Sequence, residues 1–367
     1  MRIKIQANEK KNNKEESLNE LEVLRRKQTT LTDSFGRIAR KLRISLTDRC
    51  NMRCIYCMPQ GDVNWFKEED ILNFDEILRL VAILTDLGVE KVRLTGGEPL
   101  LRPNLEDFVV SLKRMDAIKS ISMTTNGLLL ADKVKRLKEA GLESVNISLD
   151  SFKAARFKAI TGIDGFKKVM DSINAADTIG LKVKINTVVI RGWNEDEIVD
   201  FAEFARNSGH IVRFIEFMPL DGSGIWQSDL VFSKKEMIEV IINNIGEIVP
   251  LDICSNKKDS INLRNADPAA LYSFADGKGI IGFIPSITEP FCTNCDRIRL
   301  TSDGKLLTCL FEKPGYNLRN MLRKGHSENE IKMQLIANVK KKPEGIVRII
   351  EESKLKSSLS LMHRIGG

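Results

Sequence analysis

An alternation of short apolar segments with longer segments of helical periodicity constrains the fold of this chain most strongly. The short segments are rich in β-branched residues, which indicates strands at residues 42–46, 91–94, 120–123, 144–149, 183–190 and 212–217. The segments between them are predicted helices, at residues 74–87, 105–115, 131–140, 165–179 and 195–207. Gly88, Gly141 and Gly180 are predicted to end three of these helices. Repeated strand–helix units predict right-handed crossovers and a parallel sheet.

A doubly wound sheet and a complete or partial barrel both fit this alternation, and hydrophobic periodicity does not separate them. Unusual residues come directly after the predicted strands, at residues 47–49, 95–99, 124–127, 150–151 and 218–219. In parallel α/β proteins the chemistry gathers at the carboxyl ends of strands. Several strand ends that face one site describe a barrel rim better than a single crevice, so we favour a barrel.

Composition predicts a soluble, cytoplasmic protein of more than one domain. The 367 residues are 42% hydrophobic, which is enough for a substantial core, and no apolar run is long enough to span a membrane. The net charge of +7 permits an anionic substrate, but we expect no nucleic-acid partner because basic stretches are not interleaved with aromatic residues. The alternation stops near residue 251, which predicts a second, irregular domain. The predicted divisions are a charged, mobile tail with one short helix (1–29), a barrel (30–250), a cysteine-containing domain (251–340) and a C-terminal tail (341–367).

Three cysteines, Cys50, Cys54 and Cys57, follow the first predicted strand with the spacing C-x3-C-x2-C. Thiolates at this spacing can hold one small inorganic group, and they select zinc, Cu(I) or iron–sulfur clusters. A zinc site would need a fourth protein ligand, whereas three cysteines suit a cubane cluster with one iron left open. The chain's three histidines lie far away in sequence, so a zinc loop with a distant fourth ligand stays as the alternative.

A second group, Cys292, Cys295 and Cys309, has the spacing C-x2-C-x13-C. This spacing alone is less specific, because Cys254 could complete a four-cysteine zinc site. The total of seven cysteines is odd and no signal peptide precedes them, which argues against a disulfide framework.

Two arginines, Arg297 and Arg299, come directly after the second cysteine group. In an extended segment, residues two apart point to the same side. Guanidinium groups bind phosphate oxygens in pairs, so this arrangement favours a polyphosphate-binding site over a surface ion pair.

At the first cysteine group the chain resembles the radical S-adenosylmethionine superfamily, because Tyr56 precedes the last cysteine and residues 95–99 read Thr-Gly-Gly-Glu-Pro. The two glycines of that element allow close approach of a backbone or ligand. From about residue 32 onward the chain is similar to the GTP 3′,8-cyclase family. The matching segments are residues 33–37, 42–50, 93–99, 124–127, 146–151, 213–218, 291–300 and 365–367.

This resemblance implies an α/β fold, an incomplete (βα)6 parallel barrel with a smaller irregular C-terminal domain that carries the second cysteine cluster. The implied cofactors are two 4Fe–4S clusters and S-adenosylmethionine. The implied cluster ligands are Cys50, Cys54 and Cys57 at the first cluster and Cys292, Cys295 and Cys309 at the second. The implied contacts of S-adenosylmethionine are Tyr56, Gly97, Ser148 and Met218. The implied contacts of GTP are Arg43, Arg93, Thr124, Lys184, Arg297, Ile298 and Arg299.

The implied reaction is the first step of molybdopterin (molybdenum cofactor) synthesis. A 5′-deoxyadenosyl radical would take the ribose 3′ hydrogen of GTP, and the product would be (8S)-3′,8-cyclo-7,8-dihydroguanosine 5′-triphosphate. The resemblance also implies a homodimer, an electron donor and a downstream cyclic pyranopterin monophosphate synthase. Gly366 and Gly367 would reach toward the active site. One departure is Asp296, which stands where the family often has Asn and either weakens phosphate attraction or orients Arg297.

Two other functions remain open at this point. One is a different radical enzyme with a second cluster, such as a peptide-modifying enzyme, although a peptide would not need the arginines beside that cluster. The other is a zinc-stabilised binding protein without catalytic activity, which metal analysis would identify.

Overall fold

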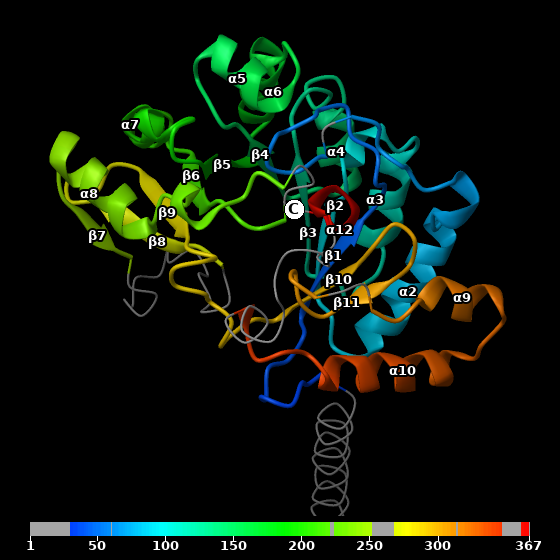
Figure 1. Cartoon of the computed structure of the whole chain (residues 1–367). Helices are drawn as coiled ribbons and strands as arrows, with labels where there is room; N and C mark the ends of the chain where they lie inside the picture. Colours follow the sequence, from blue (N-terminus) through cyan, green and yellow to red (C-terminus); the bar gives the residue numbers. More distant parts are fainter. Residues whose placement is uncertain are drawn as a thin grey trace, which may run out of the picture.

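The computed structural model describes residues 30–59, 61–220, 224–251, 268–312, 315–346 and 361–366. In these residues the strands form one sheet, in the order β11-β10-β1-β2-β3-β4-β5-β6-β9-β8-β7 (Figure 1). The strands are β1 (Lys41–Ser45), β2 (Lys91–Thr95), β3 (Ser120–Thr125), β4 (Ser144–Ser148), β5 (Lys182–Val189), β6 (Ile211–Glu216), β7 (Ile248–Pro250), β8 (Ala270–Phe274), β9 (Ile280–Ile284), β10 (Arg297–Leu300) and β11 (Leu306–Leu307).

Helices follow each of the first six strands, and the sequence predicted those that lie between the strands. They are α2 (Phe74–Asp86), α3 (Leu105–Lys113), α4 (Val134–Ala140), α5 (Ala154–Thr161), α6 (Phe166–Thr178), α7 (Ile198–Ser208) and α8 (Lys234–Asn244). The helices beyond the barrel are α9 (Leu318–Arg323), α10 (Glu328–Lys340) and α12 (Met362–Ile365). The six predicted strands and the five predicted helices are confirmed to within a few residues, and α5 and α8 were not predicted. Gly88, Gly141 and Gly180 all have positive φ angles beside helix ends, as predicted.

The sheet is an open, incomplete barrel. Strands β1 to β6 pair in parallel, and two strands from the later part of the chain extend them, with β10 parallel to β1 and β9 parallel to β6. Beyond these, β11 and the β7–β8 pair are antiparallel additions at the two edges. Within the described residues the two outer edges of the sheet do not pair with each other, so this part of the chain forms an open barrel.

Packing places the main core between the sheet and its helices, on the outer side of the barrel (Figure 1). Leu42 and Ile44 of β1 are completely buried in this core, whereas Arg43 between them lines the central cavity. The same alternation recurs along β2, where Val92 and Leu94 are buried in the core and Arg93 lines the cavity. Closed barrels fill their interior with bulky apolar side chains. This open barrel instead presents polar side chains to its interior, which suits a polar ligand.

The later part of the chain shares this core with the barrel. Leu318 of α9 and Ile331 of α10 belong to the same buried cluster as the barrel helices. A second, smaller core consists of Leu220, Phe311 and Ile346, with Cys292 and Cys309 packed against it. The second cysteine group therefore lies where the end of the barrel meets the C-terminal part.

Membrane and tail predictions can be compared with the structure only in part. Over the ranges that the structure describes, no helix has both the length and the apolar character of a membrane span. The predicted helix within residues 1–29, Cys254 and Gly367 lie outside the described residues.

A buried ion pair fixes the N-terminal segment to the loop of the second cysteine group. The Arg37 guanidinium donates to Asp33 Oδ2 at 2.5 Å and to the carbonyl oxygens of Cys292, Pro343 and Glu344 at 2.6–2.8 Å. The exposed fractions of the Arg37 and Asp33 side chains are 7% and 0%. One guanidinium therefore satisfies a buried carboxylate and three carbonyls from two distant segments.

Arg37→Met is expected to lower the free energy of unfolding by about 3–5 kcal/mol, because it leaves Asp33 buried without a cation. Urea denaturation monitored by circular dichroism measures the change. The matched control is Arg40→Met, because Arg40 is 47% exposed and lies 3.9 Å from Glu90. The control is expected to change stability by no more than about 1 kcal/mol. Equal effects of the two substitutions would contradict the anchoring role.

Candidate active site

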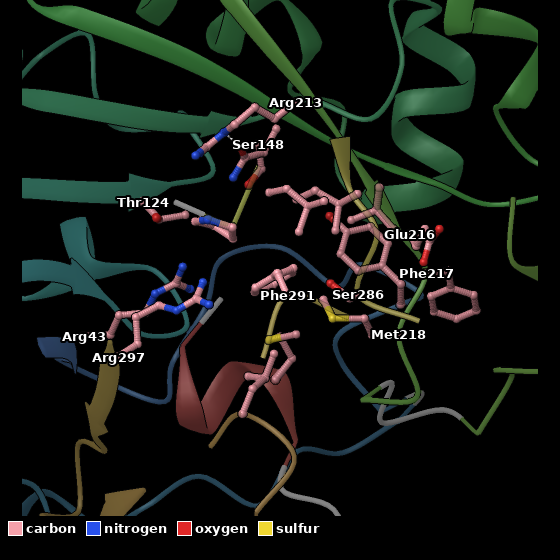
Figure 2. A pocket seen from close by; sticks show the side chains of 18 of the residues that line it. Arg43, Thr124, Ser148, Arg213, Glu216, Phe217, Met218, Ser286, Phe291 and Arg297 are labelled. Atoms are coloured by element: carbon pink, nitrogen blue, oxygen red, sulfur yellow. Dashed lines mark hydrogen bonds between the residues drawn. The ribbon is translucent and has the colours of Figure 1, made fainter. Parts of the chain in front are cut away.

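A cavity occupies the open barrel and is lined by side chains from most of its parallel strands (Figure 2). The predicted contacts of GTP and of S-adenosylmethionine face this cavity from different sides. Arg43 and Arg297, two predicted GTP contacts, lie on one side in Figure 2, and Met218, a predicted S-adenosylmethionine contact, lies on another, beside Glu216. The predicted site residues that line this cavity are Arg43, Tyr56, Arg93, Thr124, Ser148, Met218, Arg297 and Arg299.

The first cysteine group lies in the loop that follows β1. Cys50 Sγ accepts hydrogen bonds from the Met52 amide at 3.4 Å and from Asn126 Nδ2 at 3.7 Å. Burial raises the pKa of Cys50 to about 11, and it raises the pKa values of Cys54 and Cys57 well above the ordinary range. The neighbouring thiols add to the increases at Cys54 and Cys57. The structure thus gathers three partly buried thiols in one loop, and their environment disfavours the thiolate form in the absence of a bound cation.

Gly97 holds this loop against the end of β2. Its amide donates to the Thr47 carbonyl at 2.7 Å. A Cβ at Gly97 would lie 2.3 Å from Arg49 O and 2.6 Å from Asp48 O. Gly97 is therefore required for the packing of the cysteine loop, in addition to any role in binding a ligand.

Tyr56 and Asp150 form a hydrogen-bonded pair at the cavity wall. The Tyr56 hydroxyl donates to Asp150 Oδ2 at 2.6 Å, and the Val188 amide donates to Asp150 Oδ1 at 2.9 Å. Burial raises the pKa of Asp150 to about 6, while these hydrogen bonds oppose the increase. The pair holds the Tyr56 ring beside the cysteine loop, near Ser148, which also lines the cavity.

Glu98 is an organising residue that the sequence analysis did not single out. Its fully buried carboxylate accepts from the Leu100 amide at 3.0 Å, from Thr125 Oγ1 at 2.8 Å and from the Asn126 amide at 2.8 Å. Burial raises the pKa of Glu98 to about 7, against the effect of these three donors. Glu98 thereby positions Asn126, whose side chain contacts Cys50. In the sequence, the signal that could have identified Glu98 was its place in the Gly-Gly-Glu-Pro element.

The second cysteine group lines a smaller cavity next to the first one, and Arg297 and Arg299 line both. Arg297 Nη2 lies 3.5 Å from Cys295 Sγ, and Lys342 Nζ lies 3.6 Å from the same sulfur. Burial alone would raise the pKa of Cys295, but Arg297 and Lys342 lower it to about 7. Burial raises the pKa of Cys309 to about 11. The two cations therefore favour a thiolate at Cys295.

Five arginines converge on the cavity, and their guanidinium groups repel one another. Burial lowers the pKa of Arg43 well below its usual value, and Arg299, Arg93, Arg297 and Arg213 lower it further. The pKa of Arg299 falls to about 10, mainly through burial and then through Arg297. An anion in the cavity would relieve this repulsion.

Arg213 belongs to this set although the sequence analysis gave it no role. It is buried on β6, and its Nε donates to Asn186 Oδ1 at 2.9 Å.

The structure places two of the predicted GTP contacts, Ile298 and Lys184, differently from the other predicted contacts. The Ile298 side chain is fully buried in the main core, and Lys184 is not among the described residues that line the cavity.

Asp296 forms an ion pair with Lys41, with 3.1 Å between Oδ2 and Nζ. The carboxylate is directed to a lysine of the neighbouring strand β1, and the two roles considered from the sequence, weaker phosphate attraction and orientation of Arg297, stay predictions. Its second oxygen, Oδ1, is buried and has no hydrogen-bond partner among the described residues.

The C-terminal residues enter the barrel interior. Arg299 Nη1 donates to the carbonyl oxygens of Ile365, at 3.4 Å, and Gly366, and Ser45 Oγ donates to the Arg364 carbonyl at 3.1 Å. A Cβ at Gly366 would lie 2.4 Å from Thr95 Cγ2, and the residue has a φ of +75°. The predicted approach of the tail to the site is present as far as Gly366.

Comparisons with known proteins were made with family models, curated sequences and solved structures. The model of the radical SAM superfamily matches residues 44–205, and the model named Molybdenum Cofactor Synthesis C matches residues 210–347. These matches define the class: a radical SAM protein with the C-terminal region of molybdenum cofactor synthesis proteins.

The curated relatives are more specific. The chain is 42% identical to GTP 3′,8-cyclase of Thermodesulfovibrio yellowstonii over 86% of this chain and 95% of that protein. It is 41% identical to GTP 3′,8-cyclase of Syntrophomonas wolfei over 85% of this chain and 93% of that protein. It is also 42% identical to human molybdenum cofactor biosynthesis protein 1, over 82% of this chain but only 46% of that longer protein. The chain belongs to the GTP 3′,8-cyclase family.

A solved structure supports the fold alone. SuiB of Streptococcus suis, solved with its precursor peptide SuiA, matches 89% of this chain and 76% of that chain with a TM-score of 0.58 at 14% identity. Membership of the radical SAM superfamily implies a 4Fe–4S cluster and S-adenosylmethionine.

Proposed function

We propose that this protein converts GTP to (8S)-3′,8-cyclo-7,8-dihydroguanosine 5′-triphosphate, the first step of molybdenum cofactor synthesis. The observation that carries this proposal is the arginine set, which lines a cavity that Tyr56 of the first cysteine loop also lines, while Arg297 and Arg299 also line the cavity of the second cysteine group. A nucleoside triphosphate matches this arrangement, because its phosphates need cations and its reacting sugar must lie near the first cysteine group. The names of the curated relatives support the same reaction.

The first cysteine group fits a 4Fe–4S cluster. Its three thiols are partly buried, and desolvation followed by nearby acidic groups and thiols raises their pKa values, so a bound cation would favour the thiolates. When bound, such a cluster reduces S-adenosylmethionine to give a 5′-deoxyadenosyl radical. In this proposal Tyr56, Ser148 and Met218 hold S-adenosylmethionine against the cysteine loop, together with the backbone of Gly97.

A second 4Fe–4S cluster is proposed at Cys292, Cys295 and Cys309. Arg297 and Lys342 favour a thiolate at Cys295, which a cluster needs as a ligand. The family resemblance, rather than this geometry, favours a cluster over the zinc alternative. The guanine edge of GTP would bind this cluster.

The remaining residues of the cavity orient GTP. Arg43, Arg93 and Arg299 bind the phosphates in this proposal, and Arg297 lies between the phosphates and the second cysteine group. Thr124 contributes a hydroxyl from the cavity wall. Lys184 and the backbone of Ile298 complete the proposed contacts.

The deciding experiment measures 5′-deoxyadenosine. The protein is purified without oxygen, its clusters are reconstituted, and reductant and S-adenosylmethionine are added with GTP, with ATP or with neither. We expect 5′-deoxyadenosine to form with GTP and not with ATP, together with the cyclised nucleotide. Formation that is independent of GTP would overturn the substrate while leaving the radical chemistry.

A peptide-modifying radical enzyme is the second candidate, because SuiB shares the fold. The arginine-lined interior disfavours it, since a peptide does not carry the charge that these cations match. Loss of GTP-dependent product together with modification of a peptide would reverse this preference.

The proposed cellular setting follows from the family. It comprises the cytoplasm, a homodimer, an electron donor that reduces the first cluster, and a cyclic pyranopterin monophosphate synthase that takes up the product.

A further inference from the structure

Lys342 is a buried lysine to which the sequence analysis gave no role. It comes two residues after the end of α10, and its amide donates to the Val339 carbonyl of that helix at 3.0 Å. Only 4% of the residue is exposed. Lysines are almost never buried to this degree unless a partner compensates their charge. The surroundings of the Lys342 ammonium therefore indicate what the neighbouring site is built to hold.

The ammonium of Lys342 contacts the second cysteine group through three acceptors. Lys342 Nζ donates to the Cys295 carbonyl at 2.8 Å and to the Arg297 carbonyl at 2.9 Å, and it lies 3.6 Å from Cys295 Sγ. An ammonium has three N–H donors, so these acceptors use all of them. One buried cation thus holds the backbone of Cys295 and of Arg297 and also faces the sulfur of a predicted cluster ligand.

Negative charge for this cation has to come from the cysteine group. Within the part of the chain that the structure describes, Lys342 makes no ion pair with a carboxylate, and its two carbonyl acceptors are neutral. Arg297 Nη2 lies 3.5 Å from Cys295 Sγ, so two cations share one sulfur. Taking a cation out of water is costly unless an anion compensates it. The arrangement therefore suits an anionic group held by Cys295.

The segment of residues 342–345 lies directly against the second cysteine group. Arg37 Nη1 donates to the carbonyls of Cys292, at 2.8 Å, and Glu344, at 2.7 Å, and so ties the segment to the cysteine loop. A Cβ at Gly345 would lie 3.0 Å from Cys292 Cβ and 3.3 Å from Cys292 Sγ. The segment is therefore fixed at Cys292, and this contact holds the Lys342 ammonium in place beside Cys295.

We infer that Lys342 supplies the positive charge that balances the group bound at the second cysteines, and that it positions Arg297. An electron added to that group is attracted by a nearby buried cation, so Lys342 raises the reduction potential of the group. The bond from Lys342 to the Arg297 carbonyl holds the backbone of an arginine that is proposed to bind GTP. This inference rests on the proposed function, which places a 4Fe–4S cluster at the second cysteine group.

A redox titration of the full chain with reconstituted clusters, followed by electron paramagnetic resonance, tests the charge. The Cys54→Ala background, in which the first cluster is expected to be absent, assigns the signal of the second. Lys342→Met is expected to lower the equilibrium constant for one-electron reduction of the second cluster at least about tenfold, which lowers its potential by about 59 mV. The first cluster is expected to keep its potential. The matched control is Lys341→Met, at the exposed neighbouring position, which is expected to change neither potential.

Lys342→Gln separates the charge from the hydrogen bonds. Its amide donates to carbonyls but is neutral, so it is expected to lower the potential as Lys342→Met does while keeping GTP affinity within about threefold of wild type. Lys342→Met leaves both carbonyls without a donor and is expected to weaken GTP binding about tenfold, as calorimetry measures. Lys342→Arg keeps the charge and is expected to keep the potential. Lys342→Gln also serves as the test of charge where Lys342→Met does not retain its iron.

Three results would overturn parts of this inference. An unchanged potential of the second cluster in both neutral variants would remove the charge role, and so would zinc at the second cysteines, because zinc takes up no electron. Wild-type GTP affinity in Lys342→Met would remove the positioning of Arg297. The redox titration needs no GTP. A lowered potential in a protein that forms no GTP-dependent product would therefore support the charge role and count against the proposed reaction alone.

Discussion

Replacing Cys54 with alanine is expected to abolish cleavage of S-adenosylmethionine and to remove the iron of one cluster. Cys54 is the middle thiol of the first group, is partly buried, and lies close enough to Cys50 and Cys57 for their charges to affect its pKa. Changes in the surroundings of metal ligands already cost about 10–100-fold in affinity or activity, so loss of a ligand is expected to cost more. Formation of 5′-deoxyadenosine and iron content are measured on protein prepared without oxygen.

The matched control for this substitution is Cys309→Ala, which makes the same change in the second group. It is expected to lose a similar amount of iron but to retain binding of S-adenosylmethionine, because the first cysteine loop is untouched. Cleavage retained in purified Cys54→Ala would refute the assignment of the first cluster.

Arg299→Ala is expected to weaken GTP binding by about 10–100-fold or more and to leave the first cluster intact. A charge-assisted hydrogen bond contributes about 1.5–3 kcal/mol, and each 1.4 kcal/mol is tenfold in affinity. Arg299 is buried beside the second cysteine group, where solvent screens its charge little. Calorimetry with GTP measures the loss, and the absorption spectrum reports on the clusters.

The structure adds a second consequence of this substitution, because Arg299 also donates to the carbonyls of Ile365 and Gly366. Its loss would release the C-terminal residues as well as the phosphate. Gly366→Ala separates these effects, since a Cβ there meets Thr95 while Arg299 stays in place. Unchanged GTP affinity in Arg299→Ala would remove the phosphate-binding role. Arg136→Ala, at a 66% exposed position, is the control.

The sequence predicted the barrel strands well because their signal is local. In β1 and β2, apolar residues that face the helices alternate with polar residues that face the interior, so both the strand and its inner face could be inferred. Helix α5 was missed because its apolar pattern is weak, with Phe157 and Ile160 as its buried apolar residues. Strands β9 and β10 were missed because their partners are distant, as in the pairing of Arg297 with Lys41.

The candidate site was predicted where a motif carried the chemistry, and less well where packing did. Cysteine spacing identified both thiol groups, and the alternation at Arg297 and Arg299 correctly placed both side chains in the cavity. Ile298 between them was assigned a GTP contact by resemblance, yet its side chain is buried in the core. Glu98 stands in the Gly-Gly-Glu-Pro element, but its hydrogen bond to Asn126 and the Lys41–Asp296 pair could not be predicted, because contacts between distant segments have no local pattern.

The pairing of β1 with β10 and of β6 with β9 has a consequence for how this chain folds. Until residues 280–300 have left the ribosome, both outer strands of the six-stranded part have unpaired backbone edges. Such edges are prone to pair with other chains, and contacts between residues more than 250 positions apart slow folding. Truncation after β7 would therefore yield an aggregation-prone fragment, and the nascent chain is a natural client for chaperones until its last strands arrive.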